Sequence, residues 1–377
     1  MLENYVDALA DAADQAEADG RFASEALTVL RESGALALGV PESYGGPGLD
    51  LRVQIEAIHN AGRASASLGT ILGMHLQQVN ALTRYGSDAL QAEVFPKLVE
   101  GALYLGSVTT EAGSGGDLRT SGYPLVSEEG GLRVNRDAPI VTGAQEADAF
   151  LIKMADPNTG SSLVYVPREM ADIDLRASSW DSLGMRESAS MGMHIAAVVP
   201  KHYLVGEPGG FESIVRELFG PFAHLSWAAS WLGAATEAGN RLVTVVRDTP
   251  GLRNKVIQSE LSLQRLARSR ECLDTVHALL EVSCRDFEVT NQTTRASSIR
   301  VNELKTSAAN LCFEAVNLMV EVGGLGHGYM RTSPTRLERA FRDLRSASMN
   351  YSNDRLYGDN GRLVLRDGFQ ALASKCP

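Results

Sequence analysis

The chain has 377 residues, of which 44% are hydrophobic and 21% charged, a balance typical of a globular protein with a large core. Its formal net charge of −11 argues against non-specific nucleic-acid binding, which needs excess positive charge. Four cysteines without C-x-x-C spacing predict reduced thiols, and no metal-binding motif is found. We find no export signal and no run of 18 apolar residues, so we expect a cytoplasmic protein without a membrane span.

Apolar spacing divides the chain into three segments. Residues 1–106 show helical spacing, interrupted by a turn rich in glycine and proline at residues 41–48. Residues 107–210 carry short β-branched runs such as AFLIKM and SLVYVP, separated by a DPNTG stretch that is typical of a hairpin turn. Residues 211–377 return to helical spacing in four stretches, 211–247, 254–281, 293–322 and 335–351. We therefore expect an α+β multidomain protein with helical, β and helical domains in that order.

Residues 107–120, SVTTEAGSGGDLRT, form the stretch that most suggests a ligand site. Glycines let a backbone approach a flat or charged ligand closely, and successive loop N–H groups can bind an anion. An ordinary surface loop has the same composition, so this stretch alone does not distinguish a ligand site from a surface loop. The later GGLGHG stretch at residues 323–328 is not a dinucleotide-binding turn, because it follows a long helix and not a strand.

Short motifs along nearly the whole chain resemble those of the acyl-CoA dehydrogenase superfamily. In order, they lie at residues 41–48, 108–117, 140–142, 184–186, 206–209, 323–326 and 338–343. The resemblance implies the acyl-CoA dehydrogenase fold: an N-terminal α-helical domain at 1–106, a middle β-barrel at 107–210 and a C-terminal four-helix bundle at 211–377. It also implies FAD bound between the β domain and the bundle, in a homotetramer or a dimer whose subunits share their cofactor sites.

The family's cofactor contacts have counterparts in this chain. The hydroxyls of Thr110 and Thr142 would bond the edge of the flavin ring. Arg247 suits the FAD diphosphate of a neighbouring subunit, because a guanidinium donates several charge-assisted bonds, and we favour this role over that of a charge at a helix C-terminus. The full set implied for the cofactor is Val108, Thr109, Thr110, Gly113, Ile140, Thr142, Arg247, Gln258, Gly323, Gly324 and Gly326. Residues 338–343 (ERAFRD) instead predict a structural ion-pair cluster.

The departures from the family concern the catalytic base. The family removes an α-proton with a Glu at one of two positions, and counting along the motifs puts Tyr351 and Ala223 there. A base must lie within hydrogen-bond reach of its proton, so Tyr351 or Asp354 would have to act instead. His75 lies where oxygenases of this fold carry a histidine near the flavin, but it could equally be a core residue. The candidates for substrate binding are Ser114, His224 and Asn350.

Two reaction types follow from the resemblance. The leading expectation is oxidation of an acyl thioester, on CoA or a carrier protein, by α-proton removal and β-hydride transfer to FAD, with an electron-transfer partner. The alternative is a monooxygenase of the same fold, which uses O2 and reduced flavin, FAD or FMN, supplied by a flavin reductase. A third interpretation is a flavin-binding subunit without catalysis. The retained cofactor counterparts argue against it.

Overall fold

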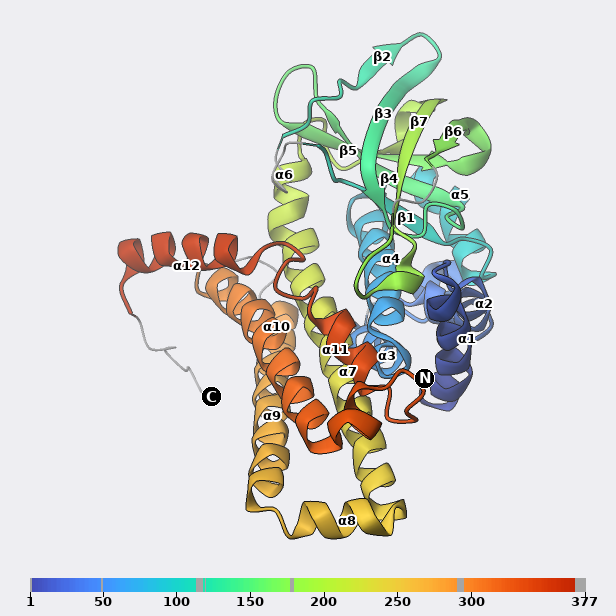
Figure 1. Cartoon of the computed structure of the whole chain (residues 1–377). Helices are drawn as coiled ribbons and strands as arrows, with labels where there is room; N and C mark the ends of the chain where they lie inside the picture. Colours follow the sequence, from blue (N-terminus) through green and yellow to red (C-terminus); the bar gives the residue numbers. More distant parts are fainter. Residues whose placement is uncertain are drawn as a thin grey trace.

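The computed structural model describes residues 2–48, 50–112, 118, 120–176, 180–289 and 295–369. Helices come first, strands follow, and helices return in the C-terminal part (Figure 1). The helices before the first strand are α1 (Val6–Asp19), α2 (Ser24–Glu32), α3 (Leu51–Ala64), α4 (Ala66–Tyr85) and α5 (Asp88–Val99). Short polar side chains begin three of them: Asp50 accepts the N–H of Arg52 at α3, Ser65 accepts that of Ser67 at α4, and Ser87 accepts that of Leu90 at α5.

Helix α4 is the centre of this part and is buried around nearly all of its surface. It is enclosed by α3, by α7 (Gly220–Asp248) and by β1 (Leu105–Val108). Two glycines bring α3 and α7 together. A Cβ on Gly62 would lie 2.4 Å from the carbonyl oxygen of Ser230, and one on Gly233 would lie 2.2 Å from that of His59. The backbones of these two helices are therefore in direct contact.

The middle part consists of two four-stranded sheets, in agreement with the β domain expected there. One sheet has the order β1, β4 (Ala149–Ala155), β5 (Ser161–Pro167) and β8 (Leu204–Val205). The other has the order β2 (Val126–Glu128), β3 (Gly131–Val141), β7 (Met191–Val199) and β6 (Ala171–Leu175). β1 pairs with β4 in parallel, and the other pairs are antiparallel. In the described residues no hydrogen-bonded strand pair joins the two sheets.

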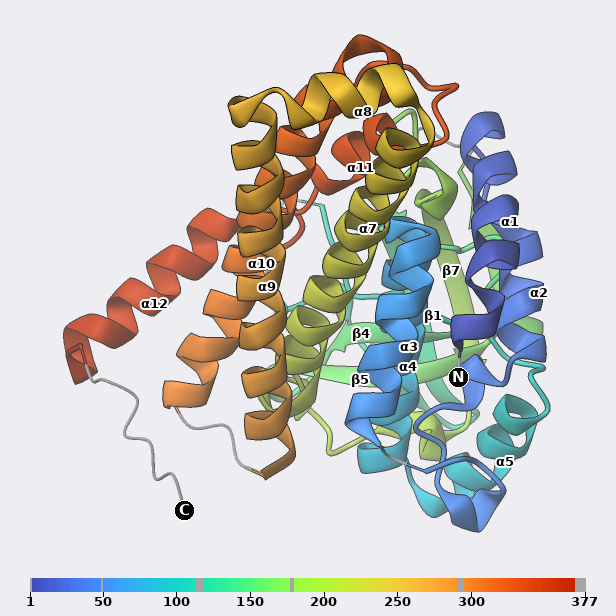
Figure 2. The same cartoon turned by 90° about the horizontal axis from the view of Figure 1, so that it is seen from below.

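The C-terminal part is a bundle in which α9 (Glu260–Val289) and α10 (Arg295–Gly324) pack with α7, and α8 (Pro250–Ile257) crosses one end (Figure 2). The single helix predicted at residues 335–351 is wrong. α11 (Leu337–Leu344) ends early, and α12 (Asn353–Asp367) is a separate helix that points away from the bundle (Figure 1). Between them Tyr351 has a φ of 48°, a left-handed conformation that an α-helix cannot contain.

The segment Ser297–Tyr329, which contains most of α10, is long and apolar enough to cross a membrane by length and composition. In the structure α10 lies against α7, α9 and α11. It also buries the ammonium-bearing side chain of Lys305 completely. These are the contacts of a helix in a protein bundle.

A buried ion cluster connects the three parts of the chain. The guanidinium of Arg339, on α11, donates to Asp14 of α1 at 2.7 Å and to Glu187, which lies in the loop before β7. Its Nε lies 3.7 Å from the Asp343 carboxylate. Glu187 is 0% exposed and Asp343 is 2% exposed, so Arg339 neutralises acids that water does not reach. The structural role predicted for this motif therefore includes holding the domains together.

Replacing Arg339 by methionine is expected to lower the free energy of unfolding by about 3–5 kcal/mol, because it leaves buried carboxylates without their cation. Chemical denaturation at neutral pH measures the change. The matched control is Arg21→Met, which breaks an exposed pair with Glu25 and should cost less than about 1 kcal/mol. Equal effects of the two substitutions would contradict a special role for Arg339.

Candidate active site

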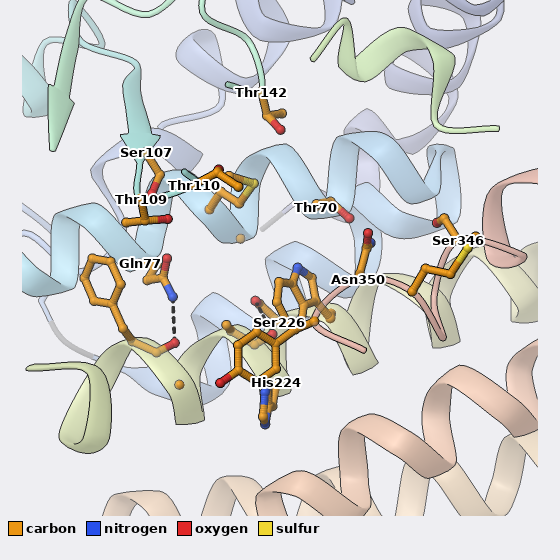
Figure 3. A pocket seen from close by; sticks show the side chains of 18 of the residues that line it. Thr70, Gln77, Ser107, Thr109, Thr110, Thr142, His224, Ser226, Ser346 and Asn350 are labelled. Carbon is orange, nitrogen blue, oxygen red and sulfur yellow. Dashed lines mark hydrogen bonds between the residues drawn. The ribbon is translucent and has the colours of Figure 1, made fainter. Parts of the chain in front are cut away.

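A cavity of about 690 Å³ lies where the three parts of the chain meet. Its lining comes from α4, the β-domain loops, the start of α7, α10 and the segment between α11 and α12. Hydroxyl groups of Ser107, Thr109, Thr110 and Thr142 lie on one side, and His224 and Asn350 lie on the other (Figure 3). Several aromatic rings also contribute to the wall: Trp180, Phe219, Trp227 and Tyr351. The cavity volume falls in the range of roughly 300–1,000 Å³ that is usual for cofactor and ligand sites.

The threonine side of the cavity fits the edge of a flavin ring. Thr110 donates its hydroxyl to the carbonyl of Ile140 at 3.2 Å, and the Thr142 hydroxyl lies 3.0 Å from that of Ser190. Thr109 and Ile140 line the same cavity. Hydroxyls that both donate and accept suit the mixed donors and acceptors of a flavin pyrimidine ring. Four of the predicted cofactor residues, Thr109, Thr110, Ile140 and Thr142, thus line this cavity, whereas the Val108 side chain points into the core at 0% exposure.

Two predicted residues, Gly113 and Ser114, lie outside the described part of the chain. Thr110 and Glu111, just before them, are held by a buried charge cluster that the sequence analysis missed. Glu111 lies 3.1 Å from Arg136 and 3.3 Å from Lys153, and both cations are 0% exposed. Arg136 also donates to the carbonyl oxygen of Thr110 at 2.8 Å. The available signal was Lys153, a single charge inside the otherwise apolar strand β4, whereas Arg136 does not stand out among the polar residues of β3.

The remaining cofactor candidates lie far from this cavity. None of the residues Arg247, Gln258, Gly323, Gly324 and Gly326 lines it. Arg247 is exposed at the end of α7, and Gln258 caps α8 at the far end of the bundle. Since α7 rises 1.5 Å per residue, Arg247 lies about 35 Å from His224 along the helix. Within one chain the cofactor residues at the cavity therefore lie apart from those at the far end of the bundle. The predicted contact of Arg247 and Gln258 with a neighbouring subunit's cofactor remains a prediction.

The structure does not support a catalytic role for His75. Its side chain is 0% exposed and does not line the cavity, although Gly73 and Met74 do. Nε2 donates to the Leu36 carbonyl at 2.8 Å, and Nδ1 accepts the N–H of Leu105 at 3.0 Å. Burial lowers the pKa of the ring to about 4, so it is neutral. His75 joins α4 to β1 as a core residue, which corrects the sequence-based expectation.

Both positions of the family's base open onto the cavity. Ala223 and Tyr351 line it, and the ring of Tyr351 lies 5.8 Å from that of His224. Asp354 is exposed at the start of α12 and does not line it. Among the described lining residues the only acid is Asp359, which pairs with Arg362 at 2.8 Å.

His224 is the lining residue whose environment is most altered. It is 5% exposed, and burial lowers the pKa of its ring to about 3, with the Lys305 charge acting in the same direction. Its Nδ1 has no hydrogen-bond partner in the described residues. The imidazole is therefore neutral and offers no positive charge to a ligand.

Two family profiles match this chain. The acyl-CoA dehydrogenase N-terminal domain matches residues 2–102, and the acyl-CoA dehydrogenase C-terminal domain matches residues 225–354. The chain belongs to the acyl-CoA dehydrogenase superfamily. It has the N-terminal helical domain, the middle β-sheet domain and the C-terminal helical domain of that fold.

The chain's relatives fall into two groups. It is 29% identical to the dibenzothiophene monooxygenase of Rhodococcus qingshengii over 219 residues, which are 55% of this chain and 52% of that protein. The match thus spans about half the length of that relative. It is 24% identical to the acyl-CoA dehydrogenase of Bacillus subtilis (strain 168) over 347 residues, 89% of this chain and 88% of that protein.

Solved structures of both groups share the fold. The dibenzothiophene monooxygenase of Paenibacillus sp. A11-2 with FMN and indole has a TM-score of 0.84 at 21% identity, covering 97% of this chain and 96% of that chain. Butyryl-CoA dehydrogenase from Megasphaera elsdenii has a TM-score of 0.83 at 18% identity, with the same coverage. At these identities the likeness concerns the fold alone.

The neutral state of His75 predicts a pH dependence of stability. Its folded pKa of about 4 lies below its ordinary 6.5, so its contribution is complete above pH 6.5 and is lost as the pH falls toward 4. At 1.36 kcal/mol per unit the loss is roughly 3 kcal/mol. Denaturation of the protein and of a His75→Gln variant at pH 7, 5.5 and 4 measures it. If both lose the same stability on acidification, His75 is not the titrating group.

Thr142→Val is expected to weaken flavin binding roughly three- to tenfold, because it removes one hydroxyl from the ring edge while keeping the side-chain shape. Quenching of flavin fluorescence on titration with apoprotein gives the Kd. Thr244→Val, on the exposed surface of α7, is the matched control and should leave the Kd unchanged. An unchanged Kd for Thr142→Val would remove Thr142 from the flavin site.

Proposed function

We propose that this protein is a flavin-dependent monooxygenase that acts on a small, largely apolar substrate. The observation that carries the proposal is the neutral lining of the cavity at both positions where the family has its base, Ala223 and Tyr351. This reverses the order in which the sequence alone ranked the two reactions. The monooxygenases among the relatives support the same choice.

Dehydrogenation of an acyl thioester needs a base at the α-proton. Ala223 has no ionisable group, and the phenol of Tyr351 is a weak base. Asp359, the one acid among the described lining residues, is held by Arg362 on the surface of α12. Oxygenation requires no α-proton removal, so it tolerates this lining.

In the proposed reaction one atom of O2 enters the substrate, the other leaves as water, and two electrons come from reduced flavin. The flavin supplies the electrons that activate O2. The chain's own residues bind the ring edge through Thr110 and Thr142, and the aromatic wall excludes water and packs against the substrate. Nδ1 of His224 has no hydrogen-bond partner in the described residues, but it is buried, so His224 contributes its ring to the cavity wall and no polar contact to the substrate. Asn350, in the segment between α11 and α12, offers a polar contact to the substrate.

The remaining partners follow from this proposal. The flavin is FMN or FAD, and a separate flavin reductase supplies it in reduced form. The active form is a homo-oligomer, a dimer or a tetramer, in which Arg247 and Gln258 contact the cofactor of a neighbouring subunit. Their exposed position at the far end of the bundle is compatible with such a contact.

Acyl-thioester dehydrogenation is the second candidate. It is favoured by the alignment with the Bacillus subtilis acyl-CoA dehydrogenase, which extends over 89% of this chain. In that reaction Tyr351 would have to be the base, since it is the ionisable residue at a family base position. The substrate would be bound to CoA or to a carrier protein.

Isotope labelling separates the two reactions. The holoprotein, given a flavin reductase, NADH and ¹⁸O2, is expected to transfer one labelled oxygen atom to indole or dibenzothiophene, as mass spectrometry of the product would detect. In a parallel anaerobic experiment butyryl-CoA should not bleach the oxidised flavin. Tyr351→Phe should retain most oxygenation. Bleaching by butyryl-CoA that Tyr351→Phe abolishes, with no label in the aromatic products, would overturn the proposal in favour of dehydrogenation.

A further inference from the structure

Lys305 is a buried cation that the site described above does not use. It lies on α10, is 0% exposed and does not line the cavity. Its Nζ donates to the carbonyl oxygens of Ala347 at 3.0 Å and Tyr351 at 3.1 Å, and to Oδ1 of Asn353 at 2.7 Å. The ammonium has three hydrogens, so these three acceptors use all of them.

The partners of Lys305 are all neutral. No ion pair between Lys305 and a carboxylate occurs within the described ranges, and Nζ lies 5.6 Å from the ring centre of Trp231. Burial lowers the pKa of the ammonium to about 8. A buried charge without a counter-ion is costly unless hydrogen bonds and a π-face compensate it. The environment of Lys305 is therefore arranged around its three contacts with the segment between α11 and α12.

This segment carries the strained residue of the site. Tyr351 has a φ of 48°, where the side chain of a residue other than glycine meets the backbone. Such a conformation persists only where surrounding contacts determine it. Lys305 supplies two of them on either side of the bend, through the carbonyls of Ala347 and Tyr351. Asn353, the third acceptor, begins α12 and is itself held by Asn310 of α10 at 3.1 Å.

The position of the segment decides the shape of the cavity. Met349, Asn350 and Tyr351 all line it, and the Tyr351 ring faces that of His224 at 5.8 Å between centres. If the carbonyls of this segment were released, the bend could relax and the ring would leave the wall. Lys305 thus acts on the site through the backbone, without touching what the cavity holds.

We propose that Lys305 is a positioning residue: it binds the carbonyls of Ala347 and Tyr351, fixes the left-handed bend at Tyr351, and so keeps the phenol ring on the cavity wall. The proposal rests on the proposed function only in taking the cavity as the substrate site. The contacts themselves do not depend on which reaction occurs there.

Hydrogen exchange provides a test that needs no knowledge of the reaction. In Lys305→Met, amide exchange of residues 346–353 is expected to rise at least tenfold in the flavin-bound protein, while exchange in α9 stays unchanged. Lys305→Arg keeps hydrogen-bond donors at this position. Its amide exchange at residues 346–353 should lie between that of the unsubstituted protein and that of Lys305→Met. Lys153→Met is the matched control, since it removes a buried lysine elsewhere and should raise exchange near Thr120 but not at residues 346–353. Unchanged exchange of residues 346–353 in Lys305→Met overturns the proposal.

A double-mutant cycle covers the case in which Lys305→Met is poorly folded. Tyr351→Gly removes the cost of the positive φ, so Lys305→Met should shift the denaturation midpoint less when it is combined with Tyr351→Gly than when it is made alone. Additive shifts mean that Lys305 only fills space, and would overturn the proposal. For turnover, Lys305→Met should raise KM for indole at least tenfold with a smaller change in kcat. If no variant oxygenates indole but residues 346–353 exchange faster, the proposed function fails and the positioning role stands.

Discussion

The cavity exists only where three domains meet, so its geometry depends on the contacts that hold the domains together. The most constraining of these is the buried guanidinium of Arg339, which binds acids from α1 and from the loop before β7 while lying against Asp343. Asp343 in turn accepts the N–H of Met185 at 2.7 Å, and Met185 lines the cavity. A charge cluster that would be costly if any member were missing thus runs from the domain junction to the wall of the site.

The site itself combines a polar edge with a largely neutral interior. Hydroxyls from the β domain provide hydrogen bonds along one side, whereas aromatic rings from α7 and the segment after α11 form much of the other. Arg216, Arg342, Arg345 and Asp359 lie on the cavity wall, and two buried cations behind it, Arg136 and Lys305, donate to carbonyl oxygens. The chain therefore uses buried cations to fix its backbone, and leaves redox chemistry to the flavin.

The sequence predicted the order of the domains because glycine and proline turns and changes of apolar period are local signals. It also named Thr110 and Thr142, which share the cavity, because a short motif marks each of them. It could not predict that His75 is fully buried. Nearly all of α4 is buried, including polar residues such as Gln77 and Gln78, so no polar face distinguishes the core from the site. The end of α11 at Leu344 was missed because helical spacing continues to residue 351. The bend at Tyr351 was missed because tertiary contacts from Lys305 impose a conformation that residue type does not encode. Arg136 and Lys153 were passed over for a similar reason: their partner, Glu111, is remote in sequence.

The backbone contact between α3 and α7 also bears on how a substrate reaches the cavity. At Gly62 and Gly233 main-chain atoms of one helix touch the other, so no side chain lies between them that could rotate away. Neither glycine lines the cavity, but this contact fixes α7, which contributes to the cavity wall, against α3. Two cavity-lining residues are instead more than half exposed, Leu183 at 62% and Met349 at 61%, and both lie in connecting segments outside helices and strands. We expect the entrance to the cavity to lie between Leu183 and Met349, with their flexible apolar side chains along its border.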